Sequence, residues 1–418
     1  MNIPLSQPDI GEREIEAVTR VLRSGRLSLG PALEEFELRF AAYAGTRFAV
    51  AVSSGTAALH LCVKALGIGA GDEAITSSFS FVASANCLIY EKARPVFADI
   101  DPLTLNIDPS AIRELIEREY VRDSGAKCLV NRRSGRSLKA ILPVHIFGLP
   151  CEMESILEIA REYGLRVIED ACEALGAEYR GLRVGRFGDA AVFAFYPNKQ
   201  MTSGEGGMIV TDNQQIAESC RSLRNQGRAE DDGWLVHSHL GYNYRLSELH
   251  CALGLAQLDR VGAFLSKRKR VVQIYTECLG DVPQLECPVE YPDAKRSWFT
   301  YVIQLQPNSA APRRDALMAA LHARGIDCRP YFPAIHRQPY FQKAEMIASG
   351  ALPHAESAAE RCLALPFFAS MSAAQVQEVC AAIREILHEQ EARKIELTVC
   401  EHAGLHTAAT IVGKGVEV

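Results

Sequence analysis

One lysine in this chain is placed where its side-chain amine could do chemistry. Lys199 follows the apolar run from Ala190 to Phe195 and precedes the glycine-rich run Gly204-Glu205-Gly206-Gly207. The apolar run predicts a buried strand with the lysine just beyond its end. A lysine at the edge of a buried sheet loses part of its hydration and can act as an amine nucleophile. A solvated lysine in a surface turn is the alternative, so residues elsewhere in the chain must decide.

Two other segments place suitable groups where a predicted strand ends. Ser53-Ser54-Gly55-Thr56 lies between an apolar run and a helical pattern, and free backbone N–H groups at a helix N-terminus bind phosphate. Asp170 follows the apolar run Val167-Ile168, and a carboxylate there could hold the protonated nitrogen of a pyridine ring. Each segment also fits an ordinary helix cap, which is the alternative in both cases.

Two aromatic residues, Phe79 and Phe81, follow a further predicted strand. Either ring could stack on a flat cofactor, with core packing as the alternative. The phosphate turn, the aromatic pair, Asp170 and Lys199 thus follow one another along the chain. Pyridoxal phosphate requires three things of a protein: a lysine for a Schiff base, a carboxylate for the pyridine nitrogen and a binding site for the phosphate. We therefore predict a pyridoxal-phosphate site.

The elements that must position these groups alternate between strand and helix. Short apolar runs and helical patterns follow each other in the first half of the chain: runs at 48–52, 73–76, 95–98, 140–144 and 165–168, and helical patterns at 57–66, 81–91 and 153–163. This alternation predicts an α/β fold, with a mostly parallel sheet covered by helices on both faces.

The pattern changes in the second half of the chain. A long helical pattern at 246–279 leads to a smaller C-terminal α+β region. We place the large cofactor-binding domain at 1–255, the small domain at 256–390, and a tail of little periodicity, which we expect to be mobile, at 391–418. The polar, net-basic segment 118–136 is interpreted as a surface insertion, with a flexible loop as the alternative.

Composition argues against several classes of protein. Of 418 residues, 48% are hydrophobic and 23% charged, as in ordinary globular proteins, and the net charge of −6 argues against a nucleic-acid-binding surface. We find no basic segment followed by an apolar run at the N-terminus and no apolar run long enough to span a bilayer, so we expect no membrane partner. Thirteen cysteines without a Cys-x-x-Cys pair fit reduced thiols in a cytoplasmic protein better than disulfides or a metal site.

Several ordered motifs together resemble the DegT/StrS-type sugar aminotransferases over about residues 1–390. They are Ser54-Gly55-Thr56-Ala57-Ala58-Leu59, Pro143-Val144-His145-Ile146-Phe147-Gly148, Glu169-Asp170-Ala171-Cys172-Glu173-Ala174, Phe195-Tyr196-Pro197-Asn198-Lys199 with the glycine-rich run after it, Leu223-Arg224-Asn225-Gln226-Gly227-Arg228 and Gly241-Tyr242-Asn243-Tyr244-Arg245. The resemblance implies fold-type I, pyridoxal phosphate and a homodimer with shared active sites.

The resemblance also implies roles for individual residues. For the cofactor, it implies that Lys199 forms the Schiff base, that Asp170 binds the ring nitrogen, and that the backbone of Gly55 and Thr56 binds the phosphate. It also implies that Phe81 stacks on the ring and that Asn243 contacts the phosphate bound in the partner subunit. It further implies that His145, His336 and Arg26 lie near the substrate. For the two histidines, a structural role is the alternative.

At two positions the chain departs from the commonest pattern of this family. Ala194 stands where many relatives have a serine whose hydroxyl helps to hold the phosphate, so one hydrogen bond worth about 1 kcal/mol is lost. Glu173 stands where others have Gln or His against the 3′-oxygen of the cofactor, and relatives that make 4-amino sugars such as perosamine share it. An ionised carboxylate there would be repelled, so we expect Glu173 to be protonated or turned aside.

The resemblance implies an enzyme of amino-sugar or polysaccharide biosynthesis. It would transfer an amino group from L-glutamate to a nucleotide-linked keto-sugar of the 4-keto-6-deoxy type. A non-nucleotide keto-cyclitol acceptor is one alternative. A pyridoxamine-dependent sugar dehydratase would carry histidine in place of Lys199, and a non-catalytic sensor would not need Lys199 and Asp170 intact.

Overall fold

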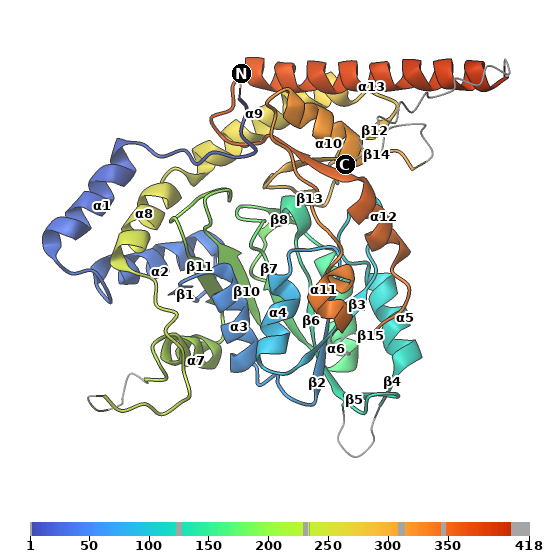
Figure 1. The fold of residues 1–418 in the computed structure, drawn as a ribbon. Helices are drawn as coiled ribbons and strands as arrows, with labels where there is room; N and C mark the ends of the chain where they lie inside the picture. The colour runs from blue at the N-terminus through green and yellow to red at the C-terminus, as the bar shows by residue number, and fades with distance from the viewer. Residues whose placement is uncertain are drawn as a thin grey trace, which may run out of the picture.

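A mostly parallel sheet forms the centre of the larger part of the protein (Figure 1). The computed structural model describes residues 2–122, 128–228, 233, 235–307, 314–343 and 348–402. Within these residues, ten strands belong to this sheet. Eight of them follow one another across it in the order β1 (Phe48–Val52), β11 (Gly207–Thr211), β10 (Ala190–Ala194), β7 (Arg166–Asp170), β6 (Ser137–Leu142), β2 (Asp72–Ser77), β3 (Arg94–Ala98) and β15 (Ala348–Ser349).

The strand directions bring several strand ends to one edge of the sheet. β11 runs antiparallel to both of its neighbours, β1 and β10, while β10, β7, β6, β2 and β3 pair in parallel. Consequently β1, β2, β7 and β10 all point the same way, and their carboxyl ends lie at the same edge. In open α/β sheets this is the edge where ligands bind.

Helices cover both faces of the sheet because alternate strand residues point to opposite sides. Val50 and Val52 of β1 pack in one core with α3 (Gly55–Ala65), α4 (Ala83–Tyr90) and α7 (Gln214–Arg224). Ala49 and Ala51 pack on the other face against α2 (Pro31–Ala44). Further along that second face lie α5 (Pro109–Glu119) and α6 (Met153–Tyr163). The predicted α/β fold with a largely parallel sheet is confirmed.

A second core lies in the C-terminal part of the described chain. A three-stranded antiparallel sheet, in the order β12–β14–β16, packs with α9, α10 and α13. The bounds are β12 (Leu285–Glu286), β14 (Tyr301–Leu305), β16 (Cys362–Leu365), α9 (Val261–Leu279), α10 (Arg314–Ala323) and α13 (Ala373–His402). Ile3 joins this core through a bridge to Ile326, so the first residues of the chain pack with its C-terminal part.

The remaining elements connect and flank these two cores. Helix α1 packs on α8, and α8 also packs on α2. Their bounds and those of the shorter elements are α1 (Glu12–Ser24), α8 (Glu248–Leu258), β4 (Tyr120–Arg122), β5 (Leu129–Asn131), β8 (Glu178–Tyr179), β9 (Leu182–Arg183), β13 (Ala294–Lys295), α11 (Pro339–Lys343) and α12 (Pro353–Arg361).

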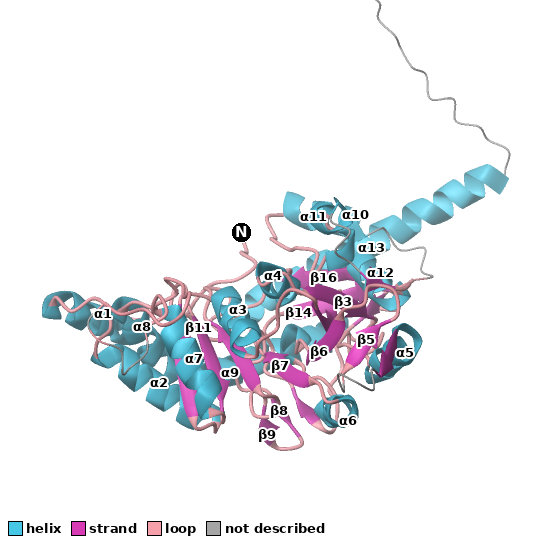
Figure 2. Cartoon of the chain, turned by 90° about the horizontal axis from the view of Figure 1, so that it is seen from below, coloured by secondary structure: helices cyan, strands magenta, loops and turns pink. Residues whose placement is uncertain are grey.

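Three segments differ from what the sequence patterns suggested. The segment 118–136 contains β4 and β5, which extend the main sheet because β5 pairs with β6; residues 123–127 lie outside the described part. The helical pattern at 246–279 is two helices, α8 and α9, so a boundary at residue 255 would fall inside α8. Helix α13 continues to His402, beyond residue 391, and Figure 2 shows its last turns projecting from the body of the protein. Residues 403–418 lie outside the described part.

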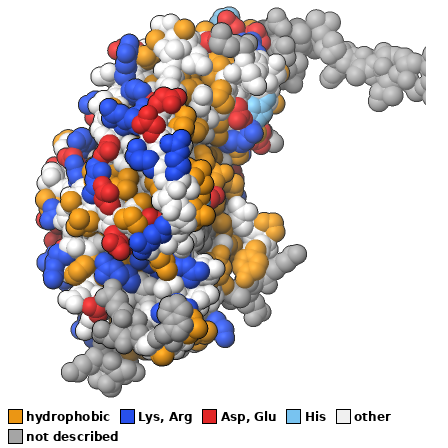
Figure 3. Space-filling view, turned by 90° about the vertical axis from the view of Figure 1, so that its left-hand side faces the viewer, with side chains coloured by type: hydrophobic (Ala, Val, Ile, Leu, Met, Phe, Trp, Pro, Cys, Tyr) orange, Lys and Arg blue, Asp and Glu red, His pale blue; other side chains and the backbone are white. Residues whose placement is uncertain are grey.

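The surface formed around α1, α2 and α8 carries charges of both signs. Figure 3 shows basic and acidic side chains next to each other on this side of the protein. Several of them are paired, including Arg39 with Glu35 and Arg260 with Glu14. None of the described helices combines the length and the apolar character needed to cross a lipid bilayer.

Candidate active site

A cavity of about 810 Å³ opens at the carboxyl edge of the sheet. The predicted cofactor residues that line it are Gly55, Thr56, Phe81, Asp170, Glu173 and Lys199. They meet there because each follows or ends one of the strands that point the same way. The opposite wall comes from the C-terminal part of the chain, through Phe299 and residues between Pro330 and Phe341.

Lys199 stands in the turn after β10 with its amine inside the cavity. Its backbone N–H bonds the carbonyl of Tyr196 at 2.9 Å, which closes the turn. The Nζ atom lies 4.0 Å from the centroid of the Phe299 ring and 3.7 Å from Oε1 of Glu173. The side chain is only 14% exposed. The amine is therefore held between an aromatic face and a carboxyl group, with little contact with solvent.

Asp170 ends β7 and presents its carboxylate to the same cavity. Oδ2 accepts a hydrogen bond from Ser84 Oγ at 2.7 Å, and Oδ1 accepts one from the backbone N–H of Cys172 at 3.1 Å. These bonds fix the direction of the carboxylate, which is 5% exposed. A buried anion at this position can hold a proton on a ring nitrogen that approaches it.

The turn between β1 and α3 provides the donors for a phosphate. Ser54 caps the helix by accepting from Ala57 N–H at 3.1 Å, and the N–H groups of Gly55 and Thr56 precede the first intrahelical bond. A Cβ at Gly55 would lie 2.8 Å from Ala194 Cβ, so the backbone approaches β10 too closely for any larger residue. At Gly207 a Cβ would lie 2.4 Å from Ser54 O, which explains the last glycine of the run after Lys199.

The structure distinguishes the two aromatic residues that follow β2. Phe81 is 59% exposed and lines the cavity, so its ring is available to a bound cofactor. Phe79 is fully buried and packs edge-on against Phe147 and Phe332. Phe79 is a core residue.

Glu173 lies deep in the cavity beside Lys199. Its Oε2 accepts the backbone N–H of Phe147 at 2.9 Å. Burial raises the pKa of Glu173, although the positive charge of Lys199 and the Phe147 N–H act in the opposite direction. The carboxyl group is turned toward the lysine at the cavity wall and keeps its proton to a higher pH than an exposed glutamate does.

The two histidines proposed near the substrate do not line the cavity. His145 is fully buried, with Nδ1 accepting from Cys151 N–H at 3.0 Å and Nε2 3.1 Å from Glu169 Oε2. Its backbone N–H bonds the carbonyl of Asp170 at 3.1 Å, so it supports the strand end that carries the carboxylate. His336 bridges Ser78 Oγ and Glu356 Oε1, at 2.6 and 2.9 Å, behind the cavity wall.

Arg26 and Asn243 also lie outside the cavity of their own chain. Arg26 follows α1, and its guanidinium donates to Leu29 O at 2.7 Å in a hollow between α1, α2 and α8. Asn243 is exposed and pairs through its backbone with Asn225. An exposed position is what a contact with a second subunit requires.

Sequence reasoning missed the roles of three residues that contribute to the site. Ser84 orients Asp170 from helix α4, Phe299 supports the lysine amine, and Cys172 packs against the phosphate turn. Phe299 belongs to none of the recognised motifs and lies 100 positions after Lys199 in the chain. Cys172 was part of a recognised motif but had no role assigned to it.

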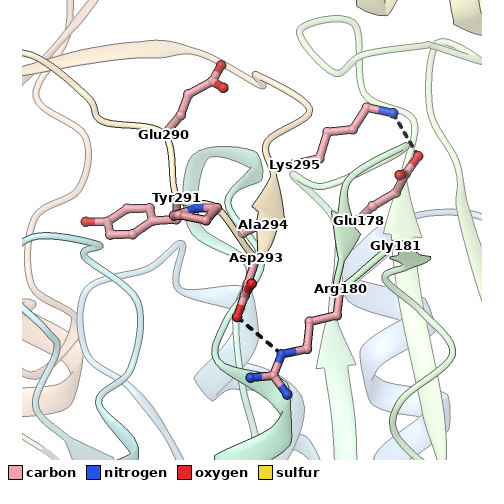
Figure 4. Close-up of a pocket in the computed structure, with 9 residues that line it drawn as sticks. Glu178, Arg180, Gly181, Glu290, Tyr291, Asp293, Ala294 and Lys295 are labelled. Atoms are coloured by element: carbon pink, nitrogen blue, oxygen red, sulfur yellow. Dashed lines mark hydrogen bonds and ion pairs between the residues drawn. The ribbon is translucent and has the colours of Figure 1, made fainter.

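A second hollow, also of about 810 Å³, lies between the β8–β9 hairpin and residues 290–295 (Figure 4). Four of its charged side chains already pair with each other: Lys295 with Glu178 at 2.8 Å, and Arg180 with Asp293 at 3.3 Å. None of the residues predicted to be functional lines it. Among the described residues, no group of three or more His, Cys, Asp or Glu side chains is arranged to hold a metal ion.

Comparison with known proteins agrees with the geometry of the main cavity. The sequence pattern described as the DegT/DnrJ/EryC1/StrS aminotransferase family matches residues 8–384. The chain belongs to this family. The predictions of a pyridoxal-phosphate-dependent sugar aminotransferase and of its fold-type I architecture are therefore confirmed.

Individual relatives match over nearly their whole length. The spore coat polysaccharide biosynthesis protein SpsC of Bacillus subtilis is 37% identical, covering 92% of this chain and 97% of SpsC. The crystal structure of DesV of S. venezuelae with a ketimine intermediate is 34% identical, covers 92% and 98% of the two chains, and gives a TM-score of 0.81. DesI, crystallised with its TDP-sugar product, is 31% identical, covers 96% of each chain, and gives a TM-score of 0.83.

The residues of the cavity fit pyridoxal phosphate. Gly55 and Gly207 let the turn before α3 pack closely against β10 and β11, and Gly55 and Thr56, with N–H groups that precede the first intrahelical bond, line the cavity. Asp170 is buried and oriented, and Lys199 has an amine in the cavity. Ala194 has no hydroxyl to offer a phosphate, so the N–H groups of Gly55 and Thr56 would carry more of its charge.

Proposed function

We propose that this enzyme transfers the amino group of L-glutamate to a keto-sugar carried on a nucleoside diphosphate, with Lys199 as its Schiff-base lysine. The observation that carries the proposal is that the Lys199 amine, the Asp170 carboxylate and the free N–H groups of Gly55 and Thr56 all line one cavity. The SpsC and DesI relatives support a sugar acceptor, because they are described by polysaccharide biosynthesis and by a TDP-sugar product.

Each of these residues has a separate task in holding the cofactor. Gly55 and Thr56 donate backbone N–H groups to the phosphate, assisted by the positive end of the α3 dipole. Phe81 offers a ring face for stacking, and Asp170 holds a proton on the ring nitrogen. When bound, pyridoxal phosphate supplies an electron-accepting ring that stabilises the negative charge left on the amino-acid carbon.

Lys199 has two tasks, as nucleophile and as proton carrier. Its amine would hold the cofactor covalently and would become free once the amine of a substrate replaced it. The free Nζ then removes the proton from the α-carbon of glutamate and later donates one to the product. Phe299, in contact with the amine, limits the access of water to this proton.

The second substrate reacts in the same cavity after 2-oxoglutarate has left. Among the described residues that line the cavity, Lys199 carries the one basic side chain, while Asp170, Glu173 and Glu205 are acidic. A diphosphate therefore needs positive groups from outside this lining. We propose a homodimer of the cytoplasm in which Asn243 of each chain reaches the phosphate in the other chain's cavity.

The replacement Lys199→Ala tests the central assignment. We expect loss of turnover and of the visible absorption that a lysine-bound cofactor gives. The fall in rate should be at least about a thousandfold, because both the covalent attachment and the proton carrier are removed. Lys295→Ala, at a lysine that is 69% exposed, is the control and should behave as the wild type. Full transaminase activity in Lys199→Ala would contradict the assignment.

A two-stage spectroscopic experiment identifies the acceptor. The enzyme is first reacted with L-glutamate until the visible band is lost, and 2-oxoglutarate is removed. Nucleotide-linked 4-keto-6-deoxy sugars with TDP, UDP or GDP and, separately, a keto-inositol are then added. We expect one nucleotide sugar to restore the band at a catalytically competent rate. Restoration by the keto-inositol alone would show that the acceptor class is wrong, while the donor half of the proposal would stand.

A further inference from the structure

The buried arginine Arg268 has an unusual set of partners next to the reactive lysine. It projects from α9 and is 3% exposed. Its guanidinium donates to three backbone carbonyls: to Lys199 at 3.1 Å, to Phe299 at 3.0 Å and to Trp298 at 3.4 Å. Its Cζ atom lies 5.3 Å from the centroid of the Phe367 ring. Among the described residues, no carboxylate pairs with it.

An unpaired buried cation is costly, so its retention needs a reason. Burial lowers the pKa of Arg268 to about 10, and the group is still charged at neutral pH. Breaking such a contact leaves either an uncompensated charge or three unsatisfied carbonyls. A lysine or an apolar residue could fill the same space, but neither has a planar fork that bonds two chain segments at once.

The two segments that Arg268 joins are the ones that define the direction of the lysine amine. Lys199 carries the amine, and Phe299 provides the ring on which Nζ rests at 4.0 Å. These residues lie 100 positions apart, one in the turn after β10 and the other before β14. One rigid guanidinium bonded to both carbonyls fixes the distance between the backbone that bears the amine and the ring below it.

We propose that Arg268 is a positioning residue that holds the amine of Lys199 in the direction required for its bond with the cofactor. It does not touch the cavity and acts through the backbone of Lys199 and Phe299. The inference rests on the proposed role of Lys199. A small displacement of a reacting group is sufficient to slow a reaction by one or two orders of magnitude.

The test separates positioning from general stability by measuring two kinds of cofactor binding. Apo-enzyme is mixed with pyridoxal phosphate and treated with borohydride after increasing times, and the adduct on the Lys199 peptide is measured by mass spectrometry. Affinity for pyridoxamine phosphate, which cannot bond to the lysine, is measured in parallel. For Arg268→Met we expect adduct formation to slow by about tenfold or more, with an affinity for pyridoxamine phosphate within about threefold of the wild type.

Arg296→Met is the matched control. Arg296 is a half-buried arginine whose pKa burial also lowers to about 10, and its guanidinium lies 4.7 Å from the centroid of Trp298. It makes no hydrogen bond to Lys199 or Phe299 among the described residues, so its loss should leave the rate of adduct formation unchanged. If Arg296→Met slows the reaction as much, or if both kinds of binding weaken equally in Arg268→Met, Arg268 has only a general structural role.

Arg268→Lys keeps the proposal testable if the methionine variant does not fold. It retains a positive charge but replaces the fork by a single ammonium group, so we expect slower adduct formation than in the wild type. A wild-type rate in either folded Arg268 variant overturns the proposal. An adduct on another lysine in the wild type would overturn the assignment of Lys199 itself and would be recognised before any variant is compared.

Discussion

The amine of Lys199 has two neighbours of opposite character, the ring of Phe299 and the carboxyl group of Glu173. The ring favours a positive charge on the amine through its electron-rich face. The carboxyl group favours it only when ionised, and burial raises the pKa of Glu173. The protonation of Glu173 is therefore sensitive to anything that enters the cavity and changes the hydration of this carboxyl group.

The elevated pKa of Glu173 predicts how this residue affects stability. The folded state binds its proton more tightly than the unfolded state does, so the contribution of Glu173 to stability decreases as pH rises from the unfolded pKa, near 4.5, through the folded value. The loss is about 1.4 kcal/mol for each unit by which the pKa is raised. Glu173→Gln removes this dependence.

Urea unfolding of apo-enzyme at several pH values between 4 and 8 checks this prediction. The free energy of unfolding of Glu173→Gln should improve relative to the wild type as the pH increases. Glu178→Gln, at a carboxylate on the surface hairpin that pairs with Lys295, serves as the control. A difference between Glu173→Gln and wild type that is constant over the whole range would show that burial does not control this carboxyl group.

At the scale of elements, the start of α3 depends on its close approach to β10. Gly55→Ala would place a Cβ 2.8 Å from Ala194 Cβ and 3.0 Å from Cys172 Sγ. The Ala194 Cβ is fixed to its backbone and has no rotamer to change, so the first turn of α3 must shift. We expect a cost of about 1–3 kcal/mol, mainly as weaker binding of the phosphate.

Equilibrium binding of pyridoxal phosphate to the apo-enzyme measures this effect. The dissociation constant of Gly55→Ala should rise by at least about tenfold, since 1.4 kcal/mol corresponds to that factor. Gly262→Ala in α9 is the control, because a Cβ there meets no atom within 4 Å. Unchanged affinity in Gly55→Ala would mean that the phosphate does not bind at this turn.

Sequence patterns predicted the elements that carry the cofactor residues because local rules determine them. The apolar run Phe48–Val52 is β1, and the residues after it supply the helix N-terminus. The local pattern alone left the choice between Phe79 and Phe81 open, because it depends on which ring faces the core, and only the family resemblance indicated Phe81. The break between α8 and α9 at Asp259-Arg260 contains neither glycine nor proline. The contacts of Phe299 and Arg268 with Lys199 arise from packing between distant segments and leave no local pattern.

At the scale of the whole molecule, the proposed homodimer makes a testable prediction about Asn243. Its side chain is exposed and lies outside the cavity of its own chain. If it reaches the partner's phosphate, then Lys199→Ala and Asn243→Ala damage different sites of a mixed dimer. A dimer with one subunit of each kind has one site with both defects and one site with neither.

Co-expression of the two variants tests this arrangement. Each variant alone should be strongly impaired, and random mixing of equal amounts should restore roughly a quarter of the wild-type activity, because half of the dimers are mixed and each has one complete site. Co-expression of Lys199→Ala with Gly55→Ala is the comparison. Gly55 lines the same cavity as Lys199, so each site of that mixed dimer has one defect and little activity should return. Absence of complementation with Asn243→Ala would argue against a shared site.

The strand order β1–β11–β10–β7 also sets the distances across the active site. Neighbouring strands lie about 4.8 Å apart, so the strand before the phosphate turn is about 10 Å from the strand before Lys199, and Asp170 is one further spacing away. The antiparallel β11 is the spacer between the first two. Backbone hydrogen bonds set these intervals, and no single side-chain replacement alters them. Mutation can therefore readily change what binds beyond the lysine, whereas the pairing of the strands keeps the strand before the phosphate turn and the strand that carries Asp170 at a set separation.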